Sequence, residues 1–340
     1  MRFNSNDHFV VKIIALVCFT ITLFLASFLV GRFAISPLTV LKIILSKFIA
    51  IPQDWDTTLN LVVLQVRLPR IVLGILVGGA LSVSGAAYQT LFKNPMVSPD
   101  ILGVSAGAAF GAALAMINNG NWWQIQLLAF VFGIVAVAAA YTIAYVFGGN
   151  TITVLILAGI VVSSLFQSLL SIVKTLADTN NALPTITYWL MGSLGKGKNE
   201  DVLIMLPTLA LSLCLIYILR SQINVLAAGE DEARTMGVNV PLVKLVVVVC
   251  STLMTVSAIS VCGIVGWVGM VVPHIARMLT GASFSKLAVT SFFIGGAFLL
   301  LIDNVIRGIE GVELPLGVLT ALVGTPVFVL LLSRVKKGWS

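Results

Sequence analysis

The stretch IVLGILVGGALSVSGAAYQTLF, residues 71–92, has no charged side chain and lies between Arg70 and Lys93. A helix needs about 20 mostly apolar residues to cross the hydrocarbon core of a bilayer, which is about 30 Å thick. Small residues dominate the second half of this stretch, and small side chains let helix backbones approach one another closely in lipid. The stretch therefore predicts a membrane-spanning helix that packs tightly against its neighbours.

The composition of the whole chain agrees with this prediction. Of its 340 residues, 59% are hydrophobic and 10% are charged, whereas soluble domains average about 25% charged residues. The net charge is +7, but the basic residues are scattered between apolar segments and do not form the stripe that nucleic-acid binding requires. The composition thus excludes a soluble enzyme, a disordered chain and a nucleic-acid binder.

Further uncharged stretches of suitable length follow along the chain. Polar turns and glycines divide the longer ones, because such residues favour a loop over a continued helix. We expect spans at residues 13–31, 71–92, three within 101–173, 202–219, two within 245–276, 287–302 and 314–333. The sequence predicts an all-α polytopic membrane protein with about ten transmembrane helices, in a single domain over residues 1–340.

An even number of spans places both termini on the same side of the membrane. Basic residues are favoured on the cytoplasmic side. Their numbers on the two sides are nearly balanced here, but the basic tail at residues 334–337 favours the cytoplasm. We therefore expect both termini to be cytoplasmic.

Groups for catalysis or metal binding are scarce. The two histidines, His8 and His274, have no ligand partner at a useful spacing. Residues 192–198, GSLGKGK, match the first seven positions of a phosphate-binding loop, but Asn199 stands where Ser or Thr should hold Mg²⁺. We predict that the chain is not an enzyme, binds no cofactor of its own and has no metal site.

Ionisable residues within the predicted spans are also rare. Asp303 is one candidate, and Arg307 follows four residues later, where a helix places both on one face. We interpret them as a local ion pair near the membrane surface. An ion-coupled secondary transporter or channel, which needs intramembrane charges, remains the alternative function.

Charged residues gather in two places between the spans. Residues 229–237, GEDEARTMG, carry three acidic residues suited to a helix N-terminus and a glycine suited to its end. We predict a short helix, a turn and a new span. The segment is either an ordinary solvated loop or a docking element. Similarly, Arg67, Arg70 and Arg307 either anchor helices at lipid headgroups or bind acidic groups of a partner.

Several motifs, in order along the chain, resemble those of a known family. They are RLPR at 67–70, GGALSVSG at 78–85, NP at 94–95, LGVSAG at 102–107, the segment at 229–237, GWVGMVVPHIAR at 266–277, LPLGV at 314–318 and GTPVF at 324–328. Together they resemble the permease of FecCD-type ABC importers, which carry ferric siderophores, haem and cobalamin. The resemblance implies a type II importer permease in the inner membrane.

The resemblance also implies partners. Two separate ATP-binding cassette subunits would hold ATP and Mg²⁺ at the cytoplasmic face, and an extracytoplasmic binding protein would deliver substrate. A second permease copy would complete the path as a homodimer or close heterodimer. The substrate would be a metal chelate, with a ferric siderophore or haem ranked first, and cobalamin or a molybdate-type oxyanion as further possibilities.

Site residues follow from the same resemblance. A coupling loop at about residues 221–241 would contact the ATPase. Its matching residues are Gly229, Glu230, Asp231, Ala233, Arg234 and Gly237. Arg67, Arg70 and Arg307 would dock the binding protein. Asn94, Pro95 and Met96 would narrow the cytoplasmic end of the path.

Overall fold

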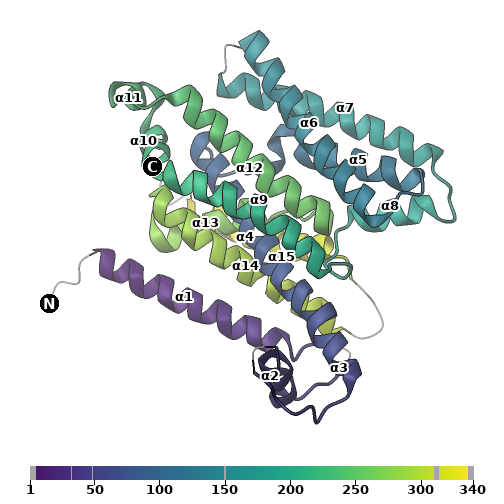
Figure 1. The fold of residues 1–340 in the computed structure, drawn as a ribbon. Coiled ribbons are helices and arrows are strands. Elements are labelled where there is room, and N and C mark those ends of the chain that lie inside the picture. Colours follow the sequence, from purple (N-terminus) through teal and green to yellow (C-terminus); the bar gives the residue numbers. More distant parts are fainter. Residues whose placement is uncertain (1–4, 32, 48, 149–150, 310–313, 336–340) are drawn as a thin grey trace.

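The computed structural model describes residues 5–31, 33–47, 49–148, 151–309 and 314–335, which form helices and connecting turns (Figure 1). Seven helical segments in this part of the chain are long and apolar enough to cross a membrane. Their helices are α1 (Ser5–Ser27), α4 (Leu68–Leu91), α6 (Trp122–Gly148), α7 (Ile152–Leu176), α9 (Asn199–Ile218), α12 (Val240–Cys262) and α14 (Phe284–Gly308).

Three further apolar helices complete the set. They are α5 (Val104–Ile117), α13 (Val268–Thr280) and α15 (Leu316–Val335). These ten helices follow the order of the ten predicted spans, so the all-α polytopic fold is confirmed. Lys336 and Lys337 of the predicted basic tail lie outside the described residues.

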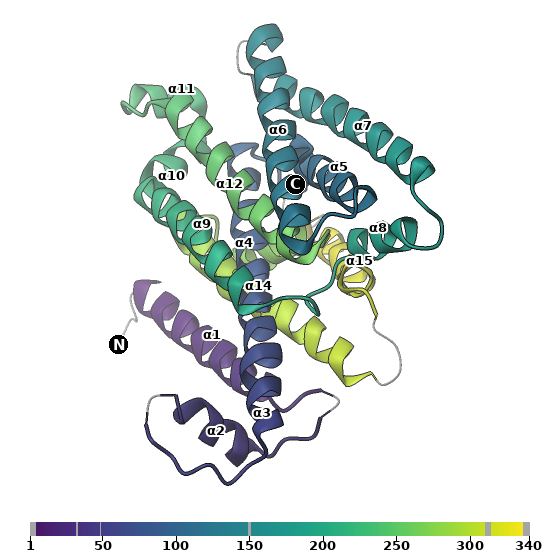
Figure 2. The ribbon, with the colours of Figure 1, turned by 45° about the vertical axis from the view of Figure 1, so that its right-hand side comes forward.

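The remaining helices connect the spans. They are α2 (Pro37–Leu45), α3 (Thr57–Leu61), a π-helical segment (Val62–Arg67), a 3-10 turn (Pro99–Leu102), α8 (Ala182–Leu190), α10 (Arg220–Ala228) and α11 (Glu230–Thr235). Figures 1 and 2 show α10 and α11 at one end of the bundle and α8 at the other. We call these the α11 end and the α8 end.

Helix α4 lies at the centre and contacts α12, α13 and α14. Glycines make this packing possible. A Cβ atom at Gly78 would lie 2.2 Å from the carbonyl oxygen of Gly295, so the backbones of α4 and α14 touch there. Gly107 and Gly111 bring α5 equally close to the α6 carbonyls of Phe132 and Leu128. The small residues therefore act as packing positions, as the sequence predicts.

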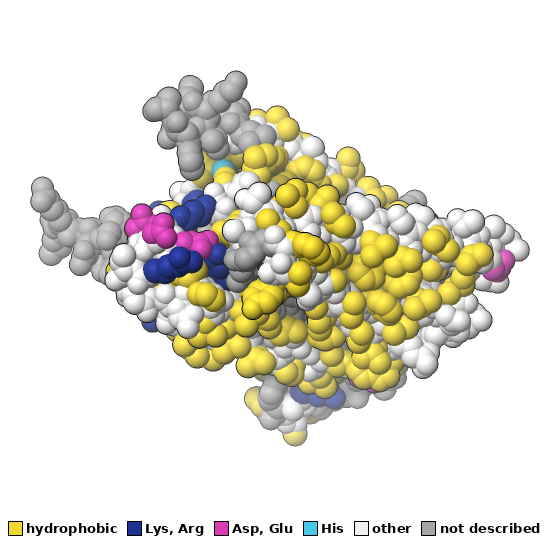
Figure 3. Space-filling view, turned by 90° about the horizontal axis from the view of Figure 1, so that it is seen from above, with side chains coloured by type: hydrophobic (Ala, Val, Ile, Leu, Met, Phe, Trp, Pro, Cys, Tyr) yellow, Lys and Arg dark blue, Asp and Glu magenta, His cyan; other side chains and the backbone are white. Residues whose placement is uncertain are grey.

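Large hydrophobic side chains remain exposed on the outside of the bundle. Phe147, Leu176 and Leu203 are among them, and Figure 3 shows a broad hydrophobic surface. A soluble monomer rarely exposes a contiguous apolar surface of such extent. A surrounding of lipid accounts for it, because lipid tails are as apolar as these side chains.

Candidate functional site

The predicted coupling segment forms a helix of its own at the α11 end. Helix α11 begins at Glu230 and ends at Thr235, and Gly237 follows with φ +77° in the left-handed region. Asn239 then caps α12, its side chain accepting a hydrogen bond from the Leu242 N–H at 3.2 Å. The expected short helix, turn and new span are confirmed. The role of the segment stays a prediction.

One side of α11 is fixed to the bundle and the other is free. Ala233 is fully buried, and the Glu230 carboxylate forms an ion pair with the Lys244 ammonium group, 2.6 Å away. Asp231, by contrast, has a side chain that is 96% exposed, 4.0 Å from the Arg234 guanidinium. Figure 3, which views the molecule from above, shows acidic side chains beside basic ones at one edge of the hydrophobic surface. The helix therefore presents charge outward from a fixed base.

The predicted gate segment follows the end of α4. The Asn94 side chain accepts a hydrogen bond from the Met96 N–H at 2.9 Å, which forms a tight turn around Pro95. Met96 is exposed. Lys93 has φ +50°, and its ammonium group donates to the Ala228 carbonyl at 3.1 Å. The residue before the gate segment is thus joined to the predicted coupling loop, directly before Gly229.

Hydrogen bonds on either side of the gate segment link α4 to neighbouring parts of the bundle. The Gln89 amide donates to the carbonyls of Val97, at 3.3 Å, and Met270, at 3.1 Å. Beyond it, Asp100 accepts a hydrogen bond from the Ser105 hydroxyl. Burial raises the pKa of Asp100, and this hydrogen bond partly offsets the shift. The gate segment therefore connects α4, α13 and the start of α5.

The three predicted docking arginines lie at the α8 end, but they do not form an open basic patch. Asp303 is fully buried and forms ion pairs with Arg70 at 2.8 Å and with Arg307 at 2.9 Å. Arg67 is buried and donates to the carbonyls of Phe28 and Phe33. The predicted pair between Asp303 and Arg307 is confirmed, whereas the participation of Arg70 was not expected. Docking by these residues stays a prediction.

The loop that resembles a phosphate-binding motif also lies at the α8 end. It follows helix α8, whereas a phosphate-binding loop follows a strand. The Ser193 N–H donates to the Cys262 carbonyl at 2.7 Å, and the Gly192 carbonyl accepts from the Leu316 N–H at 2.9 Å. The loop is therefore fixed between α12 and α15.

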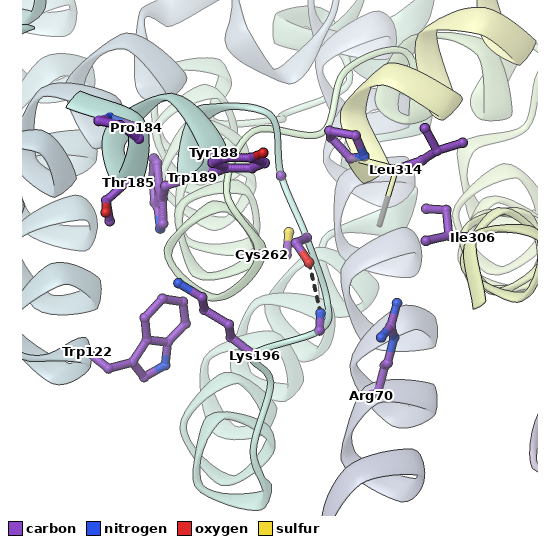
Figure 4. Close-up of a pocket in the computed structure, with 14 residues that line it drawn as sticks. Arg70, Trp122, Pro184, Thr185, Tyr188, Trp189, Lys196, Cys262, Ile306 and Leu314 are labelled. Atoms are coloured by element: carbon purple, nitrogen blue, oxygen red, sulfur yellow. Dashed lines mark hydrogen bonds between the residues drawn. The ribbon is translucent and has the colours of Figure 1, made fainter. Parts of the chain in front are cut away.

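A cavity of about 390 Å³ opens beside this loop (Figure 4). Its wall includes Trp122 and Trp189 together with Arg70 and Lys196. Sequence reasoning did not identify this cavity, because α8 is too short to register as a span. The local signal was the density of aromatic residues, at 122–123 and 188–189, next to a basic loop.

These features define a class of protein: a polytopic helical membrane protein with a charged helix at one end and a buried arginine–aspartate cluster at the other. The chain belongs to the FecCD transport family, whose model matches residues 19–334. The structure therefore confirms the class that the motifs indicate, which is the permease subunit of an ABC importer.

Two relatives and one solved structure align with most of this chain. The chain is 33% identical to the molybdate import system permease protein MolB of Haemophilus influenzae over 91% of each chain. It is 37% identical to a probable iron chelatin transport system permease protein of Helicobacter pylori, over 82% of this chain and 85% of that one. A solved structure described as an inward-facing ABC transporter of metal-chelate type covers 95% of this chain and 99% of its own, with 32% identity and a TM-score of 0.84.

Proposed function

We propose that this chain forms half of the translocation path of a binding-protein-dependent ABC importer in the inner membrane. The substrate is a metal chelate, with a ferric siderophore or haem ranked first, and cobalamin or a molybdate-type oxyanion as further possibilities. Relatives named for molybdate and for iron chelatin import support this range. A second copy of the chain completes the path as a homodimer, with both termini in the cytoplasm.

In this proposal ATP is hydrolysed by separate subunits that bind at the α11 end and hold ATP and Mg²⁺ themselves. The observation that carries the proposal is the way α11 is attached. Ala233 and the pair of Glu230 with Lys244 fix its inner side, while Asp231 and Arg234 point outward. Because α11 is attached to α12 through this ion pair, a displacement of α11 by the ATPase is transmitted to α12.

The binding protein docks at the α8 end, where Arg67, Arg70 and Arg307 line one pocket and the last two share the Asp303 carboxylate. Three guanidinium groups and one aspartate leave an excess of positive charge. Acidic groups on a partner are attracted to such an excess over several ångströms. The burial of these arginines limits the partner to carboxylates that reach into the cluster.

The test is uptake by proteoliposomes. The chain is reconstituted with its ATPase and binding protein, and uptake of a ferric siderophore, haem, cobalamin and molybdate is measured with and without ATP. We expect uptake that requires ATP, the ATPase and the binding protein together. Accumulation by the chain alone, driven only by a proton or sodium gradient, would instead establish the ion-coupled secondary transporter.

A charge-reversed variant tests the assignment of the two ends. Arg234→Glu lies on the exposed side of α11 and should weaken ATPase binding without changing the affinity for the binding protein. The proposed arrangement would be contradicted if the variant bound both partners equally more weakly, or if its affinity for both were unchanged.

A further inference from the structure

The cavity at the α8 end lies where several helices of the bundle terminate. Arg70 comes from the start of α4, Trp122 from the start of α6, Cys262 from the end of α12 and Ile306 from the end of α14, and α8 forms the remaining wall. Its volume of about 390 Å³ falls within the range of small-molecule sites. It is thus a space between helix ends at the end of the bundle opposite α11.

Positive charge and hydrogen-bond donors dominate its polar lining. Arg70 uses Nε and Nη2 on Asp303, and its Nη1 lies beside the loop, 3.5 Å from where a Cβ of Gly195 would be. The Ser193 hydroxyl oxygen accepts a hydrogen bond from the Gly195 N–H at 3.0 Å. The hydroxyl proton of Ser193 can therefore be donated to a ligand. Lys196 adds a second cation, and among the described residues that line the cavity there is no aspartate or glutamate.

Two indole groups in the wall have no hydrogen-bond acceptor within the part of the chain that the structure describes. Trp189 is only 8% exposed, and its buried Nε1 has no partner there. The buried Nε1 of Trp122 likewise has none there. An unpaired buried N–H group costs about 1–3 kcal/mol, so native structures rarely contain one without a reason. Figure 4 shows the indole nitrogen of Trp189 and the Lys196 ammonium group pointing toward one another. An oxygen atom placed between these two donors could accept a hydrogen bond from each.

We propose that this cavity binds a solute anion whose charge is carried by oxygen atoms, held between Lys196 and the Trp189 indole N–H. The inference rests on the proposed function and adds to it the charge of the substrate at this end of the path. The two candidate kinds of ligand have an anionic oxygen in common. It is supplied either by a free oxyanion, such as molybdate, or by the carboxylate oxygens of a chelate, such as ferric citrate.

The charge surrounding the cavity favours such a ligand. Arg70 and Arg307 share the single carboxylate of Asp303, and Lys196 lies over the Trp122 ring, 5.8 Å from its centre. A positive excess in a partly enclosed space raises the local concentration of anions. The aromatic wall excludes water from one side, which strengthens the electrostatic attraction.

The experiment is equilibrium binding of labelled molybdate and of labelled ferric citrate to the full chain in lipid nanodiscs, without ATP or partner proteins. We expect saturable binding of one of the two anions, and the one that binds identifies the source of the oxygen. Lys196→Gln should weaken that binding about tenfold, as loss of a charge-assisted hydrogen bond implies. Lys196→Arg should retain most of it.

Two further variants separate the cavity from general effects. Lys174→Gln removes the same charge from the last turn of α7, at the same end but outside the cavity lining, and should leave the affinity unchanged. Trp189→Phe keeps the aromatic wall and removes the indole N–H, and should weaken binding severalfold. Thermal unfolding of each variant verifies that it is folded.

Three results would overturn the inference: no saturable binding of either anion, equal weakening by Lys174→Gln, or unchanged binding in both Lys196→Gln and Trp189→Phe. Because binding is measured without ATP, it is independent of the uptake test. A chain that imports substrate but binds neither anion refutes the cavity alone, and one that binds but does not import refutes the proposed function.

Discussion

The Lys93 ammonium group donates a hydrogen bond to the Ala228 carbonyl at 3.1 Å. Lys93 lies two residues beyond the end of α4 and directly before Asn94, and Ala228 ends α10 directly before Gly229. With φ +50°, Lys93 occupies a backbone conformation that costs a residue with a side chain about 1–3 kcal/mol. The protein thus keeps a lysine at a strained position, where it joins the gate segment to the coupling segment.

Replacing this lysine should loosen the coupling. Lys93→Asn removes the ammonium group, while asparagine tolerates the left-handed conformation. We expect uptake per ATP hydrolysed to fall severalfold while ATP hydrolysis continues, because the two segments no longer move together. The ratio is measured in proteoliposomes with the ATPase and binding protein.

The matched control for this change is Lys12→Asn. Lys12 donates a similar hydrogen bond to the Leu279 carbonyl, at 2.8 Å, but does not contact the coupling segment. It should leave the ratio unchanged. If both variants lower the ratio equally, the bond from Lys93 has no special role.

Removing the buried carboxylate should destabilise the α8 end. Asp303→Ala leaves the Arg70 and Arg307 guanidinium groups facing each other without an anion, and breaking a buried ion pair in this way costs about 3–5 kcal/mol. The loss of stability is measured as a lower melting temperature of the variant in detergent. Asp231→Asn, at a highly exposed side chain, should change stability little, and a loss as large as that of Asp303→Ala would contradict the argument.

The close approach of α4 and α14 leaves no room for a methyl group. Gly78→Ala places a Cβ against the Gly295 carbonyl, and overpacking of this kind costs about 1–3 kcal/mol or more. Gly74→Ala, one turn earlier in α4, brings its Cβ no closer than 3.6 Å to any neighbour and should be tolerated. Melting temperatures of the two variants test this, and similar values would show that the helices can separate at no cost.

The ion pair at the base of α11 should matter for coupling more than for partner binding. Glu230→Gln leaves the largely buried Lys244 ammonium group without its anion, so α11 loses its fixed attachment. We expect uptake to fall while the ATPase still binds. Asp231→Asn retains the attachment and serves as the comparison. Loss of ATPase binding in Glu230→Gln would show that the carboxylate acts at the interface instead.

Much of the architecture followed from local properties of the chain. The longer spans were recognisable because about 20 apolar residues between charged ones match the thickness of the bilayer, and a helix pairs its own backbone groups within the segment. The shorter helices α5 and α13 were recognisable because polar turns and glycines divide the longer uncharged stretches. The short helix at 230–235 was predictable for a similar reason, since its acidic first turn and its terminal glycine are local signals. Helices α2 and α8 escaped prediction because they are short and apolar without spanning.

The order of the apolar helices, the packing role of the small residues and the family motifs can all be recognised from the amino-acid sequence. The contacts between side chains emerge only in the folded chain: Arg70 with Asp303, Lys93 with Ala228, and Lys196 with Trp122. Hydrophobicity acts residue by residue, whereas these contacts depend on the rotation and offset of helices that are far apart in the chain. In lipid those are set by packing and hydrogen bonding between helices.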